Sequence, residues 1–308
     1  YATQNSSLPT QEPFDWTSWQ YQPVIPTPIV LPLHFDVLAF NLSEARLQLA
    51  GQEEIKLAKV SLKASGSKKK VQLNELLVEH QQGRLIAKGN VQLNGQFEHV
   101  FSVDANALLE DKTPLKLTLR SSGNINSLTT KVELIDTTLS TDPVPSNAKP
   151  LKLTMDFTAQ PAKSTLPVKM RLDWKQLQWP LVSADFKSET GVIEIGGKLN
   201  ALKMSIMTMV SGKDVPDTKI NLSATGASTA QNKRFELNEL LLETLGGQIL
   251  SQGKLTFSEF IDWQGSSTIK HIDPSVFWPE FTADINGDIS TQAYNSQGIW
   301  KANLTKLS

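Results

Sequence analysis

Two histidine–aspartate pairs are the residues whose spacing could support acid–base or metal chemistry. His34 and Asp36, and again His271 and Asp273, stand two residues apart, so each pair shares one face if its segment is a β-strand. An imidazole beside a carboxylate can begin a metal site or transfer a proton. Neither pair has a third ligand near it in the sequence, so a solvated strand face is favoured over a functional site.

Other polar and aromatic residues also lack a chemical pattern. The run from Lys68 to Lys70 follows Ser-Gly-Ser and predicts a charged hairpin tip, with a lipid headgroup contact as the alternative. Acidic residues are dispersed without a glycosidase-like couple, and no nucleophile elbow, P-loop or dinucleotide fingerprint occurs. The sequence therefore predicts no catalytic residue, no metal and no cofactor. Four tryptophans could line a sugar site or could pack in a core or rim: Trp174, Trp179, Trp263 and Trp278.

The overall composition excludes several classes of function. A net charge of −1 over 308 residues gives no electrostatic basis for binding nucleic acid or an anionic membrane surface. Cysteine is absent, which excludes disulfides, thiolate catalysis and zinc–thiolate sites. No run approaches the roughly 20 apolar residues of a membrane span, and there is no signal peptide. The chain opens at Tyr1, and we expect it to be a piece of a longer protein.

One segment occurs almost twice. Residues 71–93 (VQLNELLVEHQQGRLIAKGNVQL) and 235–257 (FELNELLLETLGGQILSQGKLTF) align without a gap. Both contain L-N-E-L-L and then two glycines separated by five residues, and a partial third copy lies at 191–199 (GVIEIGGKL). A repeated strand–turn–strand unit predicts a stack or an extended sheet. Function is then expected along the length of the molecule and not in a single pocket.

Alternation of apolar and polar residues predicts strands through most of the chain. It is clear at 115–119, 151–157, 168–172, 204–210 and 220–224. The apolar phase shifts by one residue at Asn74-Glu75 and at Asn238-Glu239, which predicts a β-bulge in each copy of the repeat. Residues 274–279 could form one short turn. A strand and turn every 12 residues or so predicts about 20 to 25 strands, and a continuous sheet of that size would be roughly 100 Å long.

The predicted organisation is a Pro-rich extended lead-in over residues 1–30 and an elongated β-sheet trough over 31–308. A possible seam lies near 141–150, where the sequence reads TDPVPSNAKP. In all three glycine-spaced units one set of alternate positions is apolar or small and the other carries the charges and amides, as in Leu85 and Ala87 against Arg84 and Lys88. A sheet with one apolar face must cover that face with a second sheet, close into a barrel, or curl into a trough.

The repeats favour the trough: an all-β fold with a long, curved and twisted sheet of antiparallel or mixed strands and an apolar concave face. The residues expected to line its groove are Leu85, Ala87, Val91, Leu93, Leu115, Leu117, Leu119, Leu153, Met155, Met170, Leu172, Ile193, Ile195, Leu199, Ile206, Ile249, Leu255 and Phe257.

An ordered series of short motifs resembles a known family. The series runs LDWKQLQWPL (172–181), GVIEIGGKL (191–199), KDVP (213–216), the second L-N-E-L-L unit, FIDWQG (260–265), HIDPSVFWPE (271–280) and NG (286–287). This order resembles the TamB-like proteins of Gram-negative bacteria, which belong to the AsmA-like superfamily. The likeness extends from about residue 24 to the end of the chain.

The resemblance implies a place and a partner. TamB-like proteins are anchored in the inner membrane by an N-terminal helix, span the periplasm and meet an outer-membrane barrel, TamA, through their C-terminal domain. Their body is a taco-like or U-shaped β-sheet, and the family is linked to phospholipid transport and to assembly of outer-membrane proteins, including autotransporters. By this resemblance the chain is an internal part of the periplasmic body, without the anchor and without the domain that meets TamA.

Three functions remain open at this point. The first is a conduit that carries phospholipid between the inner and outer membranes, with no chemical step of its own. The second is a chaperone that templates strands of outer-membrane proteins by β-augmentation. The third and least expected is a carbohydrate-binding or hydrolytic β-sandwich. The expected partners are phospholipid and, through the full-length protein, a TamA-type barrel; nucleic acid is not expected, and the chain is expected to be monomeric or to self-associate through sheet edges.

Overall fold

A computed structural model describes residues 21–25, 27–47, 54–137, 150–181, 184–228, 233–257, 261–294 and 299–307. These residues form 17 strands of one sheet and a single short 3₁₀ helix. The strands are β1 (Phe35–Leu47), β2 (Ile55–Ser67), β3 (Lys70–His80), β4 (Gly83–Gln92), β5 (His99–Leu108), β6 (Pro114–Asn124), β7 (Ser127–Asp136), β8 (Lys152–Ala159), β9 (Val168–Trp179), β10 (Phe186–Lys198), β11 (Ala201–Gly212), β12 (Val215–Ser228), β13 (Lys233–Thr244), β14 (Gly247–Phe257), β15 (Ile261–Ile272), β16 (Ile285–Tyr294) and β17 (Ile299–Leu307), and the helix is η2 (Pro274–Val276).

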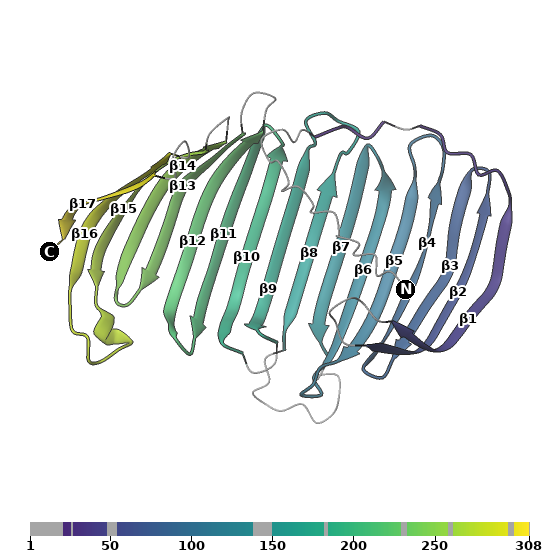
Figure 1. Cartoon of the computed structure of the whole chain (residues 1–308), viewed down its shortest axis with the longest axis horizontal. Coiled ribbons are helices and arrows are strands. Elements are labelled where there is room, and N and C mark those ends of the chain that lie inside the picture. The colour runs from purple at the N-terminus through teal and green to yellow at the C-terminus, as the bar shows by residue number, and fades with distance from the viewer. Residues whose placement is uncertain are drawn as a thin grey trace, which may run out of the picture.

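The sheet is an antiparallel meander in which every strand pairs with the next one along the chain. Strands β1 and β17 stand at its two ends, and the end strands turn away from the plane of the middle strands (Figure 1). The predicted all-β fold with one long, curved, open sheet is therefore confirmed. At about 4.8 Å per strand step, 17 strands extend over roughly 75 Å.

The predicted number of strands was too high for the described part of the chain. The estimate of about 20 to 25 strands assumed one strand and its turn per 12 residues or so. The observed strands alone reach 12 to 14 residues in β9, β12 and β13. Longer strands give a shorter and wider sheet than the sequence suggested.

The hairpin connections explain where the strands end. Lys68 and Lys69 form the turn between β2 and β3, which confirms the predicted hairpin tip. At the turn between β6 and β7, the Asn124 Oδ1 atom accepts hydrogen bonds from the amides of Asn126 (2.8 Å) and Ser127 (3.1 Å). Asparagine favours such turns because its side chain can replace a backbone acceptor.

The two full copies of the repeat fold in the same way. In the pair β3–β4 the register shifts between Leu73 and Leu76, and in the pair β13–β14 it shifts between Leu237 and Leu240. Both predicted bulges are confirmed. The partial third copy differs, because Gly191 lies inside β10, whereas the first glycines of the other two copies begin β4 and β14.

The described part of the lead-in follows one rim of the sheet. The Tyr21 hydroxyl donates to the Pro161 carbonyl over 2.6 Å, and the Ile29 amide donates to the Leu93 carbonyl over 2.8 Å. These two carbonyls lie in the β8–β9 and β4–β5 connections, so the segment runs along the hairpin tips (purple in Figure 1). Residues 1–20 and the predicted seam at 141–149 lie outside the described residues, and the division at residue 30 stays a prediction.

Candidate functional site

One face of the sheet is mostly apolar from strand to strand. Residues directly opposite each other in paired strands point to the same side of a sheet, so the register shows which side chains share a face. Ile193 is opposite Leu172 on β9 and Ile206 on β11. The same row continues from Leu172 to Met155, Val132, Leu119, Val103, Ala87, Leu76, Leu62 and Phe40, and from Ile206 to Leu222 and Leu240.

A second row, through Ile195, lies beside the first. It includes Phe157, Met170, Met204, Ala224 and Leu237. We call the side of the sheet that carries these two rows the apolar face, and the opposite side the outer face. Along β1–β16 the two rows contain no Lys, Arg, Asp or Glu. Charged residues reach the apolar face at its rims, where Asp136 is opposite Leu115 and Lys233 is opposite Phe257.

The predicted lining residues all fall on this face. Sixteen of the positions lie in β4, β6, β8, β9, β10, β11 and β14 at registered positions of the apolar face. Leu93 and Leu199 follow β4 and β10 at the rim, where their amides donate to the carbonyls of Lys69 and Thr165 over 2.7 Å each. The structure thus brings the predicted set together on one surface, and the role of that surface in lipid binding stays a prediction.

No second layer of strands packs on the apolar face within the described residues. Every extensive contact between strands joins two neighbours in the sheet. Among the described residues no large side chain is fully buried, and the most buried apolar residues include small ones such as Ala224 (1% exposed) and Ala87 (3%). The larger side chains of the two rows are mostly half-buried, so they shield one another and still present an apolar surface. A sandwich would have buried them from above.

The polar groups on the apolar face are paired with each other. The His99 Nε2 atom lies 3.1 Å from the Ser121 hydroxyl, which lies 3.1 Å from that of Thr130. The hydroxyls of Ser251 and Ser267 lie 2.7 Å apart. A buried hydroxyl without a hydrogen-bond partner is costly, and these hydroxyls have partners. Their pairing lowers the polarity of the surface and does not form a reactive site.

Glycines on this face make room for aromatic rings. The ring of Trp174 lies over Gly191, that of Phe101 over Gly89, and that of Trp263 over Gly253. A Cβ atom at any of the three glycines would lie closer than 3.0 Å to the ring, a distance that real Cβ atoms do not show. These ring contacts were not predicted from the sequence. For Gly191 and Gly89 the signal is a glycine in register with an aromatic residue on a neighbouring strand, whereas Trp263 is opposite Leu255 and reaches Gly253 diagonally.

The tryptophans mainly pack. Trp174 is 8% exposed, and its Nε1 atom donates to the Ser188 hydroxyl over 2.8 Å. Trp263 donates to the Thr291 hydroxyl over 2.9 Å. Trp278 forms an edge-to-face contact with Phe277, with ring centroids 4.9 Å apart. Of the two predicted alternatives, packing is the one that the contacts of Trp174, Trp263 and Trp278 support, whereas Trp179 is 67% exposed.

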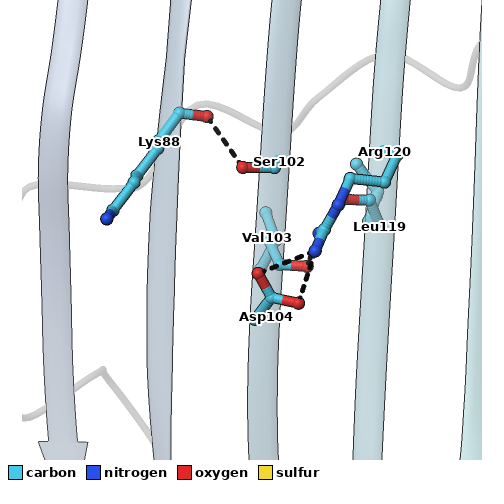
Figure 2. A network of polar contacts seen from close by, with 6 residues as sticks. All are labelled: Lys88, Ser102, Val103, Asp104, Leu119 and Arg120. Atoms are coloured by element: carbon cyan, nitrogen blue, oxygen red, sulfur yellow. Dashed lines mark hydrogen bonds and ion pairs between the residues drawn. The ribbon is translucent and has the colours of Figure 1, made fainter.

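The outer face carries ion pairs between neighbouring strands. Figure 2 shows one of them: the Arg120 Nη2 atom on β6 donates to both carboxylate oxygens of Asp104 on β5, over 2.7 and 2.9 Å. Nη1 of the same guanidinium donates to the Val103 carbonyl over 3.0 Å. Lys131 and Asp156 (3.4 Å) form a comparable pair. All of these side chains are about half exposed or more, so each pair contributes little, on the order of 0 to 1 kcal/mol.

The two histidine–aspartate pairs are not assembled into a site. His271 Nδ1 lies 3.2 Å from Asp284 and not against Asp273. Asp273 instead caps helix η2, where its Oδ1 atom accepts hydrogen bonds from the hydroxyl (2.6 Å) and amide (2.9 Å) of Ser275. These hydrogen bonds lower the pKa of the Asp273 carboxyl. His34 precedes β1, and no group of three or more potential metal ligands occurs in the described ranges.

Comparison with known families identifies the chain. The family model described as "TamB, N-terminal domain" matches residues 2–308, and the chain therefore belongs to this family. No solved structure matches it. Membership supports a role in the translocation and assembly module, and the family is a transport and assembly component and not a known enzyme family. Its proteins span the periplasm from an inner-membrane anchor and associate, at full length, with a TamA-type partner. Within the described part of this chain, no helix is long and apolar enough to cross a membrane.

Proposed function

We propose that the apolar face is a conduit surface that shields the acyl chains of phospholipid moving through the periplasm between the inner and outer membranes. The observation that supports this proposal is the pair of mostly apolar rows, which crosses β1–β16 without a charged residue and has no second layer over it among the described residues. Contact with a TamA-type barrel would be made elsewhere in the full-length protein.

The energetics require continuous shielding. Exposing a CH₂ group to water costs about 0.8 kcal/mol, so two chains of about 15 such groups cost on the order of 20 kcal/mol. A surface that covers the chains at every step removes most of that barrier. Binding is then distributed over many half-buried aliphatic side chains, and no single residue is essential for affinity.

The width of the apolar rows and the position of the charged rim residues fit the binding of acyl chains. Side chains on one face of a strand repeat about every 6.7 Å, so the two central rows and one row on either side cover about 20 Å of strand length. Beyond them stand the charged rim residues Asp136 and Lys233. An acyl chain lying on the rows would place its headgroup near a rim, in water.

Methionine methyl groups provide a direct test. The chain has five methionines. Met155, Met170 and Met204 belong to the apolar face, and Met207 and Met209 to the outer face. In a protein labelled at the methionine methyl carbons, a monomeric short-chain phosphatidylcholine should shift the first three NMR signals and leave the other two in place. Shifts confined to Met207 and Met209, or no shifts at all, would contradict the proposal.

Transport is tested by adding one charge in the full-length protein. Ile195→Asp places a carboxylate on the apolar face and should slow the supply of phospholipid to the outer membrane. Thr225→Asp is the matched control, because Thr225 lies opposite Lys203 on the outer face. Normal lipid supply with Ile195→Asp would refute the conduit.

A second candidate is the strand-templating chaperone. It is favoured by the open edge of β1, where Leu38 is 78% exposed and Phe40 is 47% exposed. An extended segment could pair with such an edge. Defective insertion of outer-membrane strands with normal lipid supply in the Ile195→Asp protein would favour this function. The third alternative, a sandwich, does not describe this fold, because the described strands form a single sheet.

A further inference from the structure

Besides its ion pairs, the outer face has a depression in its surface. It has a volume of about 670 Å³ and extends over β8 to β12. Val192, Met207 and Met209 form its apolar part. Met207 is directly opposite Val192 and lies next in sequence to Ile206, which is on the apolar face, so the depression is on the other side of the sheet. Ligand pockets commonly have volumes of about 300 to 1,000 Å³.

The apolar part of the depression includes two exposed methionines. Met207 is 53% exposed and Met209 is 47% exposed. Large apolar side chains left open to water and surrounded by charged groups are typical of a binding surface. Methionine is well suited to one, because its flexible, polarisable side chain adapts to partners of different shape.

The charges around these methionines are mostly positive. Lys152, Arg171, Lys175 and Lys219 line the depression, with Asp173 as the one carboxylate among its lining residues. Asp173 is already bound by Arg171, whose Nη2 and Nε atoms donate to it over 2.6 and 2.8 Å. Arg171 also pairs with Glu194, so its guanidinium is fully paired, and the three lysines are the remaining cations that line the depression.

Two of these lysines oppose each other. Lys152 on β8 is in direct register with Lys175 on β9, and like charges in that position destabilise a sheet. Lys152 has a carboxylate partner in Glu133 at 3.1 Å, and Lys219 has Glu243 at 2.6 Å. The Lys175 ammonium has no partner within the described residues. An added anion would relieve this repulsion.

We propose that this depression docks an acidic segment of a partner polypeptide, with an apolar side chain on Met207 and Met209 and carboxylates at Lys152 and Lys175. Four strand steps separate Lys152 from Lys219, about 19 Å at the usual spacing. One lipid headgroup does not span that distance, whereas a peptide of six or so extended residues does. The site is independent of the proposed lipid conduit, because it lies on the opposite face.

The test uses the whole chain and defined peptides. The probe is a fluorescein-labelled decapeptide of alternating Glu and Leu, compared with decapeptides of alternating Lys and Leu and of Glu and Ser. The first should bind, shift the methyl signals of Met207 and Met209, and leave those of Met155, Met170 and Met204 in place. Its affinity should fall as salt is raised, because the attraction is between partly exposed charges.

Charge reversal supplies the control. Lys175→Glu should weaken binding of the Glu–Leu peptide about fivefold to tenfold, since an attraction is replaced by a repulsion at a partly exposed site. Lys116→Glu makes the same change at an exposed outer-face lysine on β6, away from the depression, and should have little effect. Equal losses in the two variants would overturn the proposal. So would peptide binding without shifts of Met207 and Met209, or shifts of these methyls by phosphatidylglycerol vesicles in place of the peptide.

Discussion

Gly191→Ala is predicted to destabilise the middle of the sheet through a single side chain, Trp174. The added methyl group would occupy the space of the indole ring, so the ring must leave its position over β10. The φ angle of Gly191 is not positive, so the backbone at this position can accept alanine. The cost therefore comes from the ring and not from the main chain.

The size of the effect follows from what Trp174 loses. The side chain is 8% exposed, and a buried tryptophan covers on the order of 200 Å². If half of that surface is exposed, the loss at about 25 cal/mol per Å² is about 2.5 kcal/mol. Breaking the 2.8 Å hydrogen bond from Nε1 to Ser188 adds about 1 kcal/mol. The expected total is about 3 to 4 kcal/mol.

The matched control is Gly196→Ala in the same strand. A Cβ atom at Gly196 would meet nothing nearer than the Val168 carbonyl oxygen at 4.0 Å. This change should be neutral within about 0.5 kcal/mol or slightly stabilising, because alanine has less freedom to lose on folding. Urea unfolding followed by tryptophan fluorescence and circular dichroism compares the two variants, and hydrogen exchange of β9 and β10 locates the change.

A double-mutant cycle isolates the contact. In a Trp174→Leu background the ring is absent, so Gly191→Ala should lose most of its effect and the two changes should be strongly non-additive. If Gly191→Ala costs no more than Gly196→Ala, or if its cost is the same with and without the ring, the glycine does not serve to seat the tryptophan.

Three smaller predictions concern the rest of the sheet. Ile195→Asp should reduce the shifts that short-chain phosphatidylcholine causes in the methyl signals of the apolar-face methionines, and unchanged shifts would count against lipid binding on that face. Arg120→Ala should cost no more than about 1 kcal/mol in urea unfolding, because its pair with Asp104 is half exposed; a much larger loss would show that the outer-face pairs are structural. The pKa of Asp273 is lowered by hydrogen bonds from Ser275, so the cap contributes stability above the ordinary aspartate pKa and loses it as pH falls through the lowered value. The amide signal of Ser275 should titrate in that acid range, and Asp273→Asn should abolish the titration.

The apolar and polar sides of each strand could be predicted because the alternation of residues within one strand defines its two faces. Leu85 and Ala87 against Arg84 and Lys88 define the faces of β4 without knowledge of its neighbours. The phase shift at Asn74-Glu75 similarly predicts a bulge from the sequence of one strand. Antiparallel pairing of consecutive strands then places the faces of all strands on common sides.

Features that depend on the exact register could not be predicted. Gly191 meets Trp174 only because β9 and β10 pair in one particular alignment, and a shift of one residue would place them on opposite faces. The pairing of Met207 with Val192 on the outer face was likewise not predicted from the sequence. Their exposure and the lysines beside them follow from pairing across five strands, which no single strand encodes.

In a single-layer sheet, a substitution is expected to affect stability and the proposed lipid transport in different ways. Because each strand packs mainly on its two neighbours, a substitution should weaken the sheet locally, as in repeat proteins whose stability is a sum of nearest-neighbour terms. In the proposed conduit, passage along the apolar face is serial, so one charged residue at any strand should interrupt the whole path. Leu119→Asp and Ile249→Asp lie on β6 and β14 and should therefore change hydrogen exchange in different places but reduce lipid supply by similar amounts. A strong dependence of lipid supply on which strand carries the charge would indicate local binding sites in place of a continuous path.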